Sequence, residues 1–117
     1  MRIIIAGGRT FTDENLATRS LCAFVEAHKV DDIQIVSGCA RGADHIGELI
    51  AQEYMYPLHK FPADWNKYGK SAGYKRNEVM AQNADALLAF WDGESKGTKH
   101  MIDLANKHGL IVKVVRY

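Results

Sequence analysis

The chain has 117 residues, 47% hydrophobic and 25% charged, which is an ordinary composition for a globular protein. Fifteen Lys and Arg against fourteen Asp and Glu give a formal net charge of +1, which argues against nucleic-acid binding through a general basic excess. No apolar run reaches the roughly 20 residues of a membrane span. No signal-peptide pattern follows the apolar start, so we expect a cytoplasmic protein with no membrane partner.

Apolar and amphipathic segments alternate along the chain. The apolar runs predict strands at residues 2–6, 33–36, 58–61, 86–90 and 110–115. Helical spacing of apolar residues, together with start and stop signals, predicts helices at 13–28, 44–54, 76–83 and 97–108. Residues 62–74 contain two glycines and little periodicity, and they are expected to form a long irregular loop.

This alternation predicts a single α/β domain over residues 1–117. Nearly unbroken apolar strands are typical of a parallel sheet covered on both faces. Right-handed connections then give a doubly wound, Rossmann-like sheet of about five strands. Two cysteines are too few for a disulfide scaffold and lack metal-ligand spacing, and we expect Cys22 to be a small core residue. No metal site and no cofactor are predicted.

Three glycine-containing loops follow predicted strands and are expected to meet at one edge of the sheet, where such folds bind ligands. Glycine allows close backbone approach, helix starts offer free N–H groups, and arginine suits phosphate oxygens. One such loop is as often a tight turn, but three on one edge favour a ligand site. The candidate ligand-binding residues in them are Gly7, Gly8, Arg9, Thr10, Ser37, Gly38, Arg41, Gly42, Asp44, Asp92, Gly93, Ser95, Gly97 and Thr98.

A basic, aromatic segment is predicted to add Trp65, Arg76 and Asn77 to this site. Five Lys or Arg and one acid lie between Lys60 and Arg76. An aromatic ring among cations can stack a base while the cations hold phosphates. The alternative is that Trp65 packs the loop against the core and the lysines face solvent. Neither the dinucleotide fingerprint GxGxxG nor the P-loop motif is present, which disfavours ordinary dehydrogenases and P-loop NTPases.

Motifs along nearly the whole chain resemble the YspA, cpYpsA-related branch of the SLOG superfamily. They are Gly-Gly-Arg-Thr-Phe at 7–11, Ser-Gly-x-Ala-x-Gly-Ala-Asp at 37–44, Phe-Pro-Ala-Asp-Trp at 61–65, Ala-Gly at 72–73 with Arg-Asn at 76–77, and Asp-Gly at 92–93 with Gly-Thr at 97–98. The resemblance implies a Rossmann-like fold that binds nucleotides or nucleotide-derived ligands.

Two relatives of that branch suggest different activities. Residues 37–44 are similar to a loop of the DNA-processing protein A family, which binds single-stranded DNA. Arg76, Met80 and the Gly-Thr pair at 97–98 resemble the lonely-guy phosphoribohydrolases, which cleave the N-glycosidic bond of nucleoside monophosphates with an arginine and a glutamate. The position of that glutamate is held here by Met101, which can neither handle protons nor stabilise a sugar cation.

The favoured function is therefore a sensor or binding module for a nucleotide-derived small molecule, such as an ADP-ribose-type compound or a nucleoside phosphate. One alternative is an N-glycosidic or related nucleotide hydrolase in which Asp44 or Asp92 replaces the missing acid. A second alternative, single-stranded DNA binding, is opposed by the near-neutral charge. Homo-oligomer formation is compatible with the resemblance, but no interface stripe is evident in the sequence.

Overall fold

The computed structural model describes residues 1–117 and contains one sheet of five parallel strands in the order β3-β2-β1-β4-β5. The strands are β1 (Arg2–Gly7), β2 (Gln34–Ser37), β3 (Leu58–Lys60), β4 (Ala86–Trp91) and β5 (Ile111–Arg116). The chain builds outward from β1 to β3 and then crosses to the other side of β1, so the strand order reverses between β1 and β4. The predicted Rossmann-like fold is confirmed.

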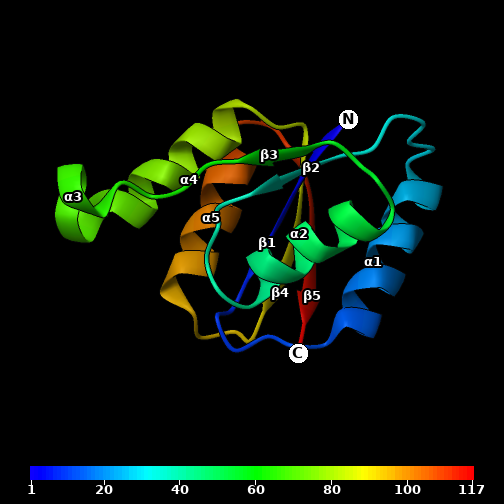
Figure 1. Cartoon of the computed structure of the whole chain (residues 1–117), viewed down its shortest axis with the longest axis horizontal. Helices are drawn as coiled ribbons and strands as arrows, with labels where there is room; N and C mark the ends of the chain where they lie inside the picture. The colour runs from blue at the N-terminus through cyan, green and yellow to red at the C-terminus, as the bar shows by residue number, and fades with distance from the viewer.

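Four longer helices cover the two faces of this sheet (Figure 1). Helices α1 (Glu14–Ala27) and α2 (Ala43–Glu53) pack on one face, and α4 (Ala72–Gln82) and α5 (Lys96–Lys107) pack on the other. The strands supply both cores by alternation, since Ile3 and Ile5 face α1 and α2 while Ile4 and Ala6 face α4 and α5. No helix combines the length and the apolar character that crossing a bilayer requires.

The prediction of an irregular loop at 62–74 is wrong. This segment contains a short helix, α3 (Trp65–Tyr68), then a 3₁₀ turn at Gly69–Ser71, and α4 already begins at Ala72. Asp64 caps α3 by accepting a hydrogen bond from the Lys67 N–H at 3.0 Å. Helix α3 buries no residue, so it has no apolar face that a periodicity search detects. In Figure 1 it projects from the body of the molecule beside α4.

The prediction that Cys22 lies in the core is also wrong. Cys22 and Cys39 are both exposed. The buried face of α1 is formed by Ala17, Leu21 and Phe24, and Cys22 falls outside this stripe.

Candidate functional site

The loops after β1, β2 and β4 meet at the carboxyl edge of the sheet, where the strand order reverses. The Gly8 N–H donates to the carbonyl of Phe90 in β4 at 3.2 Å, which joins the first loop to the fourth strand. The Gly8 carbonyl accepts from the N–H groups of Phe11 and Ala43, each at 3.2 Å, which joins the first loop to the start of α2. A reversal of strand order is where doubly wound sheets bind ligands.

The packing of this junction itself requires two glycines. A Cβ on Gly7 would lie 2.3 Å from the Phe90 carbonyl oxygen. Gly42 has φ +77°, and a Cβ there would lie 2.2 Å from the Gly8 carbonyl oxygen. Any side chain at either position would therefore separate the loops.

The amino terminus of α5 faces the same edge. Ser95 caps the helix, with its Oγ accepting from the Thr98 N–H at 3.4 Å and lying 3.0 Å from the Thr98 hydroxyl. Gly97, in the first turn, has nothing within 4 Å of where its Cβ would be. Unlike Gly7 and Gly42, Gly97 has no packing reason to be glycine. The bare backbone leaves room for an anion to approach the helix start.

Asp92 shapes the loop that leads into α5. Its Oδ1 accepts from the N–H groups of Glu94 and Ser95, each at 2.8 Å. These two hydrogen bonds lower the pKa of the Asp92 carboxyl, so it remains ionised. No hydrogen bond occupies Oδ2 in the structure, which leaves one carboxylate oxygen available at the pocket.

Asp44 and Arg76 form the buried polar centre of the site. Asp44 is only 5% exposed, and its Oδ2 accepts from the Ala40 N–H at 3.4 Å. Burial raises the pKa of Asp44 to about 6, although the positive charge of Arg76 opposes this shift. Arg76 donates through Nη1 to the Gly38 carbonyl and through Nε to Asn77 Oδ1 at 3.1 Å. A Cβ on Gly38 would collide with both Arg76 and Asp44, so glycine is required for their close approach.

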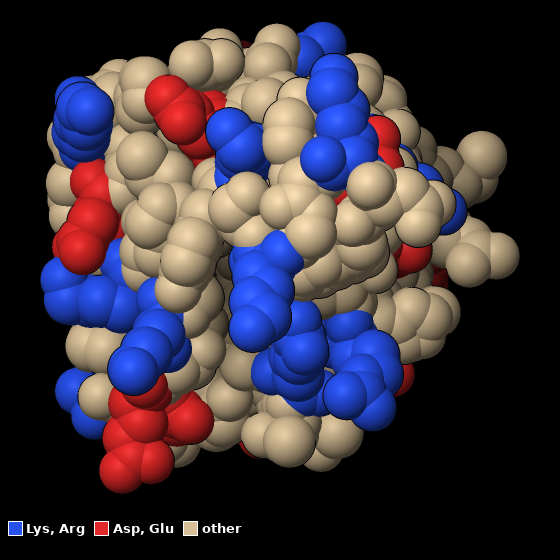
Figure 2. All heavy atoms as spheres, turned by 90° about the vertical axis from the view of Figure 1, so that its left-hand side faces the viewer, with Lys and Arg blue, Asp and Glu red and all other residues tan.

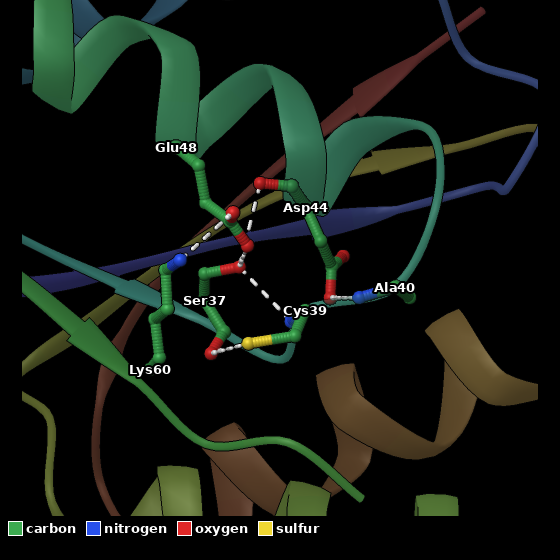
Figure 3. Close-up of polar contacts among 6 residues, drawn as sticks. All are labelled: Ser37, Cys39, Ala40, Asp44, Glu48 and Lys60. Atoms are coloured by element: carbon green, nitrogen blue, oxygen red, sulfur yellow. Dashed lines mark hydrogen bonds and ion pairs between the residues drawn. The ribbon is translucent and has the colours of Figure 1, made fainter.

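A polar network below the second loop holds that loop in place (Figure 3). The buried hydroxyl of Ser37 donates to Glu48 Oε2 at 2.6 Å and accepts from the Cys39 N–H at 3.0 Å. Glu48 Oε1 lies 3.8 Å from the ammonium of Lys60. Ser37 and Glu48 thus link β2 to α2. No sequence pattern indicates the role of Glu48, because a charged residue inside an amphipathic helix is typical of a surface position.

A cavity of about 450 Å³ opens above these groups at the reversal point. Most of the predicted ligand-binding residues line it, namely Gly7, Gly8, Arg9, Thr10, Asp44, Trp65, Arg76, Asn77, Asp92, Ser95, Gly97 and Thr98. Gly38 and Arg41 line a neighbouring pocket of about 260 Å³. Whether any of these residues contacts a ligand stays a prediction.

Three predicted site residues line neither cavity. Ser37 is completely buried in the network under the second loop. Gly42 is enclosed against Gly8 and Arg9, and Gly93 lies under the guanidinium of Arg116 with φ +89°. All three therefore shape the loops that form the site.

Four residues that line the larger cavity were not among the predicted site residues, namely Ala40, Lys70, Gly73 and Tyr74. Three of them lie in the segment expected to be irregular, and its helical course brings them to the cavity. Tyr74 packs against His100 with ring centroids 4.3 Å apart, and Asn77 Nδ2 lies 3.2 Å from His100 Nδ1. Asn77 is buried at 6% exposure and therefore links α4 to α5.

Trp65 does not pack against the core, since it is 54% exposed and lines both cavities. Figure 2 views this end of the molecule, where Lys and Arg side chains gather around the middle of the face and acidic side chains lie mostly toward its margins. Lys67 and Lys75 lie 5.0 Å and 4.9 Å from the centre of the Tyr68 ring. A base can stack on such a surface beside cations.

Met101 is 1% exposed and packs in the core between α5 and the sheet. At this position a glutamate would be buried among aliphatic side chains, away from the lining of the cavity. No three His, Cys, Asp or Glu side chains come together as a metal-binding group.

The sheet, the reversal point and the glycine loops around a polar cavity define a Rossmann-like ligand-binding domain. The model of the YspA, cpYpsA-related SLOG family matches residues 1–68, and the chain belongs to this family. It is also similar to the gene 61 protein of Mycobacterium phage D29, at 38% identity over 120 residues that cover 95% of this chain and 93% of that protein. Family membership indicates binding of a nucleotide-related ligand or a related function.

Proposed function

We propose that the protein binds a nucleotide-derived small molecule in the cavity at the reversal point, with a phosphate at the amino terminus of α5. The observation that carries this proposal is Gly97. In the first turn of a capped helix that lines a polar cavity, its bare backbone faces open space. Free N–H groups and the positive end of the helix dipole favour a phosphate there, and Arg9 and Arg76 add positive charge.

The other parts of a nucleotide have suitable partners around the same cavity. The indole of Trp65 offers an exposed face on which a base can stack. Asp92 stays ionised and has a free carboxylate oxygen, which can accept a hydrogen bond from a ribose hydroxyl. The cavity volume of about 450 Å³ lies within the range of ligand pockets. These features support an ADP-ribose-type compound or a nucleoside phosphate as the ligand.

Thermal unfolding in the presence of AMP, NAD, ADP-ribose, cyclic ADP-ribose and a single-stranded oligonucleotide tests the proposal. A ligand at a hundred times its Kd stabilises the folded state by about 2.7 kcal/mol and raises Tm. We expect at least one nucleotide to raise Tm and the oligonucleotide to have a smaller effect. A response to the oligonucleotide alone would replace this proposal with single-stranded DNA binding.

Two variants of Gly97 separate ligand binding from folding. Gly97→Ala should stabilise the free protein by about 0.4–1 kcal/mol, because alanine restricts the unfolded chain and its Cβ meets no atom here. The same methyl group obstructs a phosphate at the helix start, so ligand affinity should fall, and Gly97→Val should abolish binding. Calorimetric titration and urea unfolding of each variant measure the two effects. Unchanged affinity in Gly97→Val would mean that the phosphate binds elsewhere.

Hydrolysis of the bound ligand is a second candidate function, and the raised pKa of Asp44 favours it. A carboxyl group with a pKa of about 6 in the cavity can act as a general acid, while the ionised Asp92 can stabilise positive charge on a sugar. Chromatography after long incubation would reveal free base. The reaction should slow above about pH 6, as Asp44 loses its proton, and stop in Asp44→Asn. An unchanged ligand would favour binding alone.

A further inference from the structure

The charged side chains that line the smaller of the two cavities are all positive. Its nine lining residues include the arginines Arg9, Arg41 and Arg76 and no Asp or Glu. The rest of the wall is formed by the second loop at Gly38–Ala40, by Pro62 and Ala63, and by Trp65. A concave surface on which cations outnumber acids attracts anions.

The two cavities are adjacent. Arg9, Ala40, Trp65 and Arg76 line both of them. The larger cavity contains the start of α5 and also two acids, Asp44 and Asp92, whereas the smaller one contains Arg41. One ligand can therefore occupy both, with its middle part beside Trp65.

Two of the three arginines of the smaller cavity have no acidic partner in the protein, whereas Arg76 faces Asp44. Neither Arg9 nor Arg41 forms an ion pair or a side-chain hydrogen bond in the structure, and both are exposed. Arg9 lies close enough to Arg76 to oppose its charge, since it adds to the effect of burial in lowering the pKa of Arg76, while Asp44 counteracts both. An anion placed among these guanidinium groups would relieve this repulsion and accept forked hydrogen bonds.

We infer that the smaller cavity is a second phosphate subsite and that the ligand is a small nucleotide whose nucleoside lies between two phosphate groups. This inference rests on the proposed function, in which the first phosphate binds at the start of α5. With the base stacked on Trp65, the nucleoside spans the junction of the cavities, and the second phosphate reaches Arg41. Two phosphates joined directly to each other, as in a nucleoside 5′-diphosphate, would both remain on one side of the nucleoside.

Calorimetric titration with AMP, ADP and adenosine 3′,5′-bisphosphate tests this inference, because ADP carries as many phosphates as the bisphosphate in a different arrangement. We expect the bisphosphate to bind about tenfold more tightly than AMP or ADP. Arg41→Ala should remove most of this advantage and leave the affinity for AMP within about twofold. Arg41 makes no contact that the fold needs, so the variant should remain folded. Arg19→Ala, on the exposed side of α1, is the matched control and should change none of the affinities.

Each other outcome overturns a different statement. Binding of AMP, ADP and the bisphosphate with equal affinity would overturn the second subsite and leave the proposed function standing. An equal loss of AMP and bisphosphate binding in Arg41→Ala would place Arg41 in the first phosphate site instead. Tighter binding of a single-stranded octanucleotide would mean that the ligand is a strand rather than a small nucleotide. If none of these compounds binds, this inference fails, and the proposed function fails with it only if NAD, ADP-ribose and cyclic ADP-ribose also leave Tm unchanged.

Discussion

The buried carboxyl group of Asp44 lowers the stability of the folded protein by an amount that depends on pH. Burial raises its pKa from 3.8 to about 6 in the folded protein, so the folded state holds a proton more firmly than the unfolded state does. The contribution of Asp44 to stability is therefore greatest below about pH 4, and it is lost as pH rises from there through about 6. At neutral pH the fold contains a buried carboxylate that Arg76 and the Ala40 N–H stabilise only in part.

Asp44→Asn should increase the free energy of unfolding at pH 7.5 by up to about 3 kcal/mol, because it removes this buried charge and keeps an oxygen that accepts from Ala40. The difference between variant and wild type should shrink between pH 6 and pH 4. Urea unfolding at a series of pH values measures it. A difference that stays constant over this range would show that Asp44 is ionised throughout.

Sequence patterns predict which residues lie at the carboxyl edge of the sheet, but not which of them face the cavity. Most candidate residues follow predicted strands, and this rule correctly brings Gly8, Asp92 and Gly97 to one edge. The rule does not distinguish a residue that faces the cavity from one beneath it. Ser37 ends β2, and Gly42 follows that strand as Asp44 does. Burial of Ser37 and the close approach of Gly42 to Gly8 make both residues part of the loop support. Whether a residue faces the cavity or lies beneath it depends on how α2 packs against the first loop, which the sequence pattern does not reveal.

At the scale of whole elements, α5 matters most because its first turn lines the cavity. Removing a Ser cap costs about 1 kcal/mol, with a range of roughly 0.5–2. Ser95→Ala should lower stability by this amount and also weaken ligand binding, since Ser95 itself lines the cavity. Asp13 caps α1 in the same way, through a 2.9 Å hydrogen bond from the Leu16 N–H, and it does not line the cavity.

Asp13→Ala is therefore the matched control for this prediction. Both variants should lose similar stability in urea unfolding, and only Ser95→Ala should lose affinity in titration. Equal affinities in the two variants would argue against a phosphate at the start of α5.

Elements with a strong apolar pattern were predicted within a residue or two, as the close agreement of β1, β4 and α1 demonstrates. Helix α3 and the first turn of α4 were missed for an opposite reason. Four exposed residues capped by Asp64 leave no apolar periodicity, and Gly69 and Gly73 suggest a loop. This segment supplies Trp65, Lys70 and Tyr74, so the site was predicted least well where local capping, and not burial, determines the backbone.

For the molecule as a whole, the two cores are connected through alternating residues of the same strands. Ile4 cannot leave its core without disturbing Ile3 and Ile5 in the other. We therefore expect one cooperative unfolding transition, as for a single domain. Circular dichroism of the helices and fluorescence of Trp65 and Trp91 should change together with urea concentration. Transitions with different midpoints would instead indicate parts that unfold independently.

Arg116, the last residue of β5, and Tyr117 after it lie beside two loops of the site. A Cβ on Gly8 would touch the Tyr117 hydroxyl, and Arg116 covers Gly93 while lying 5.2 Å from the Trp91 ring. The two ends of the chain lie at opposite ends of the strands (Figure 1). Tyr117 lies on the side of the cavity, because it contacts the position of Gly8, which lines that cavity. For any immobilisation or labelling experiment the attachment point matters: a tether on Met1 leaves the ligand entrance open, and one on Tyr117 stands beside it.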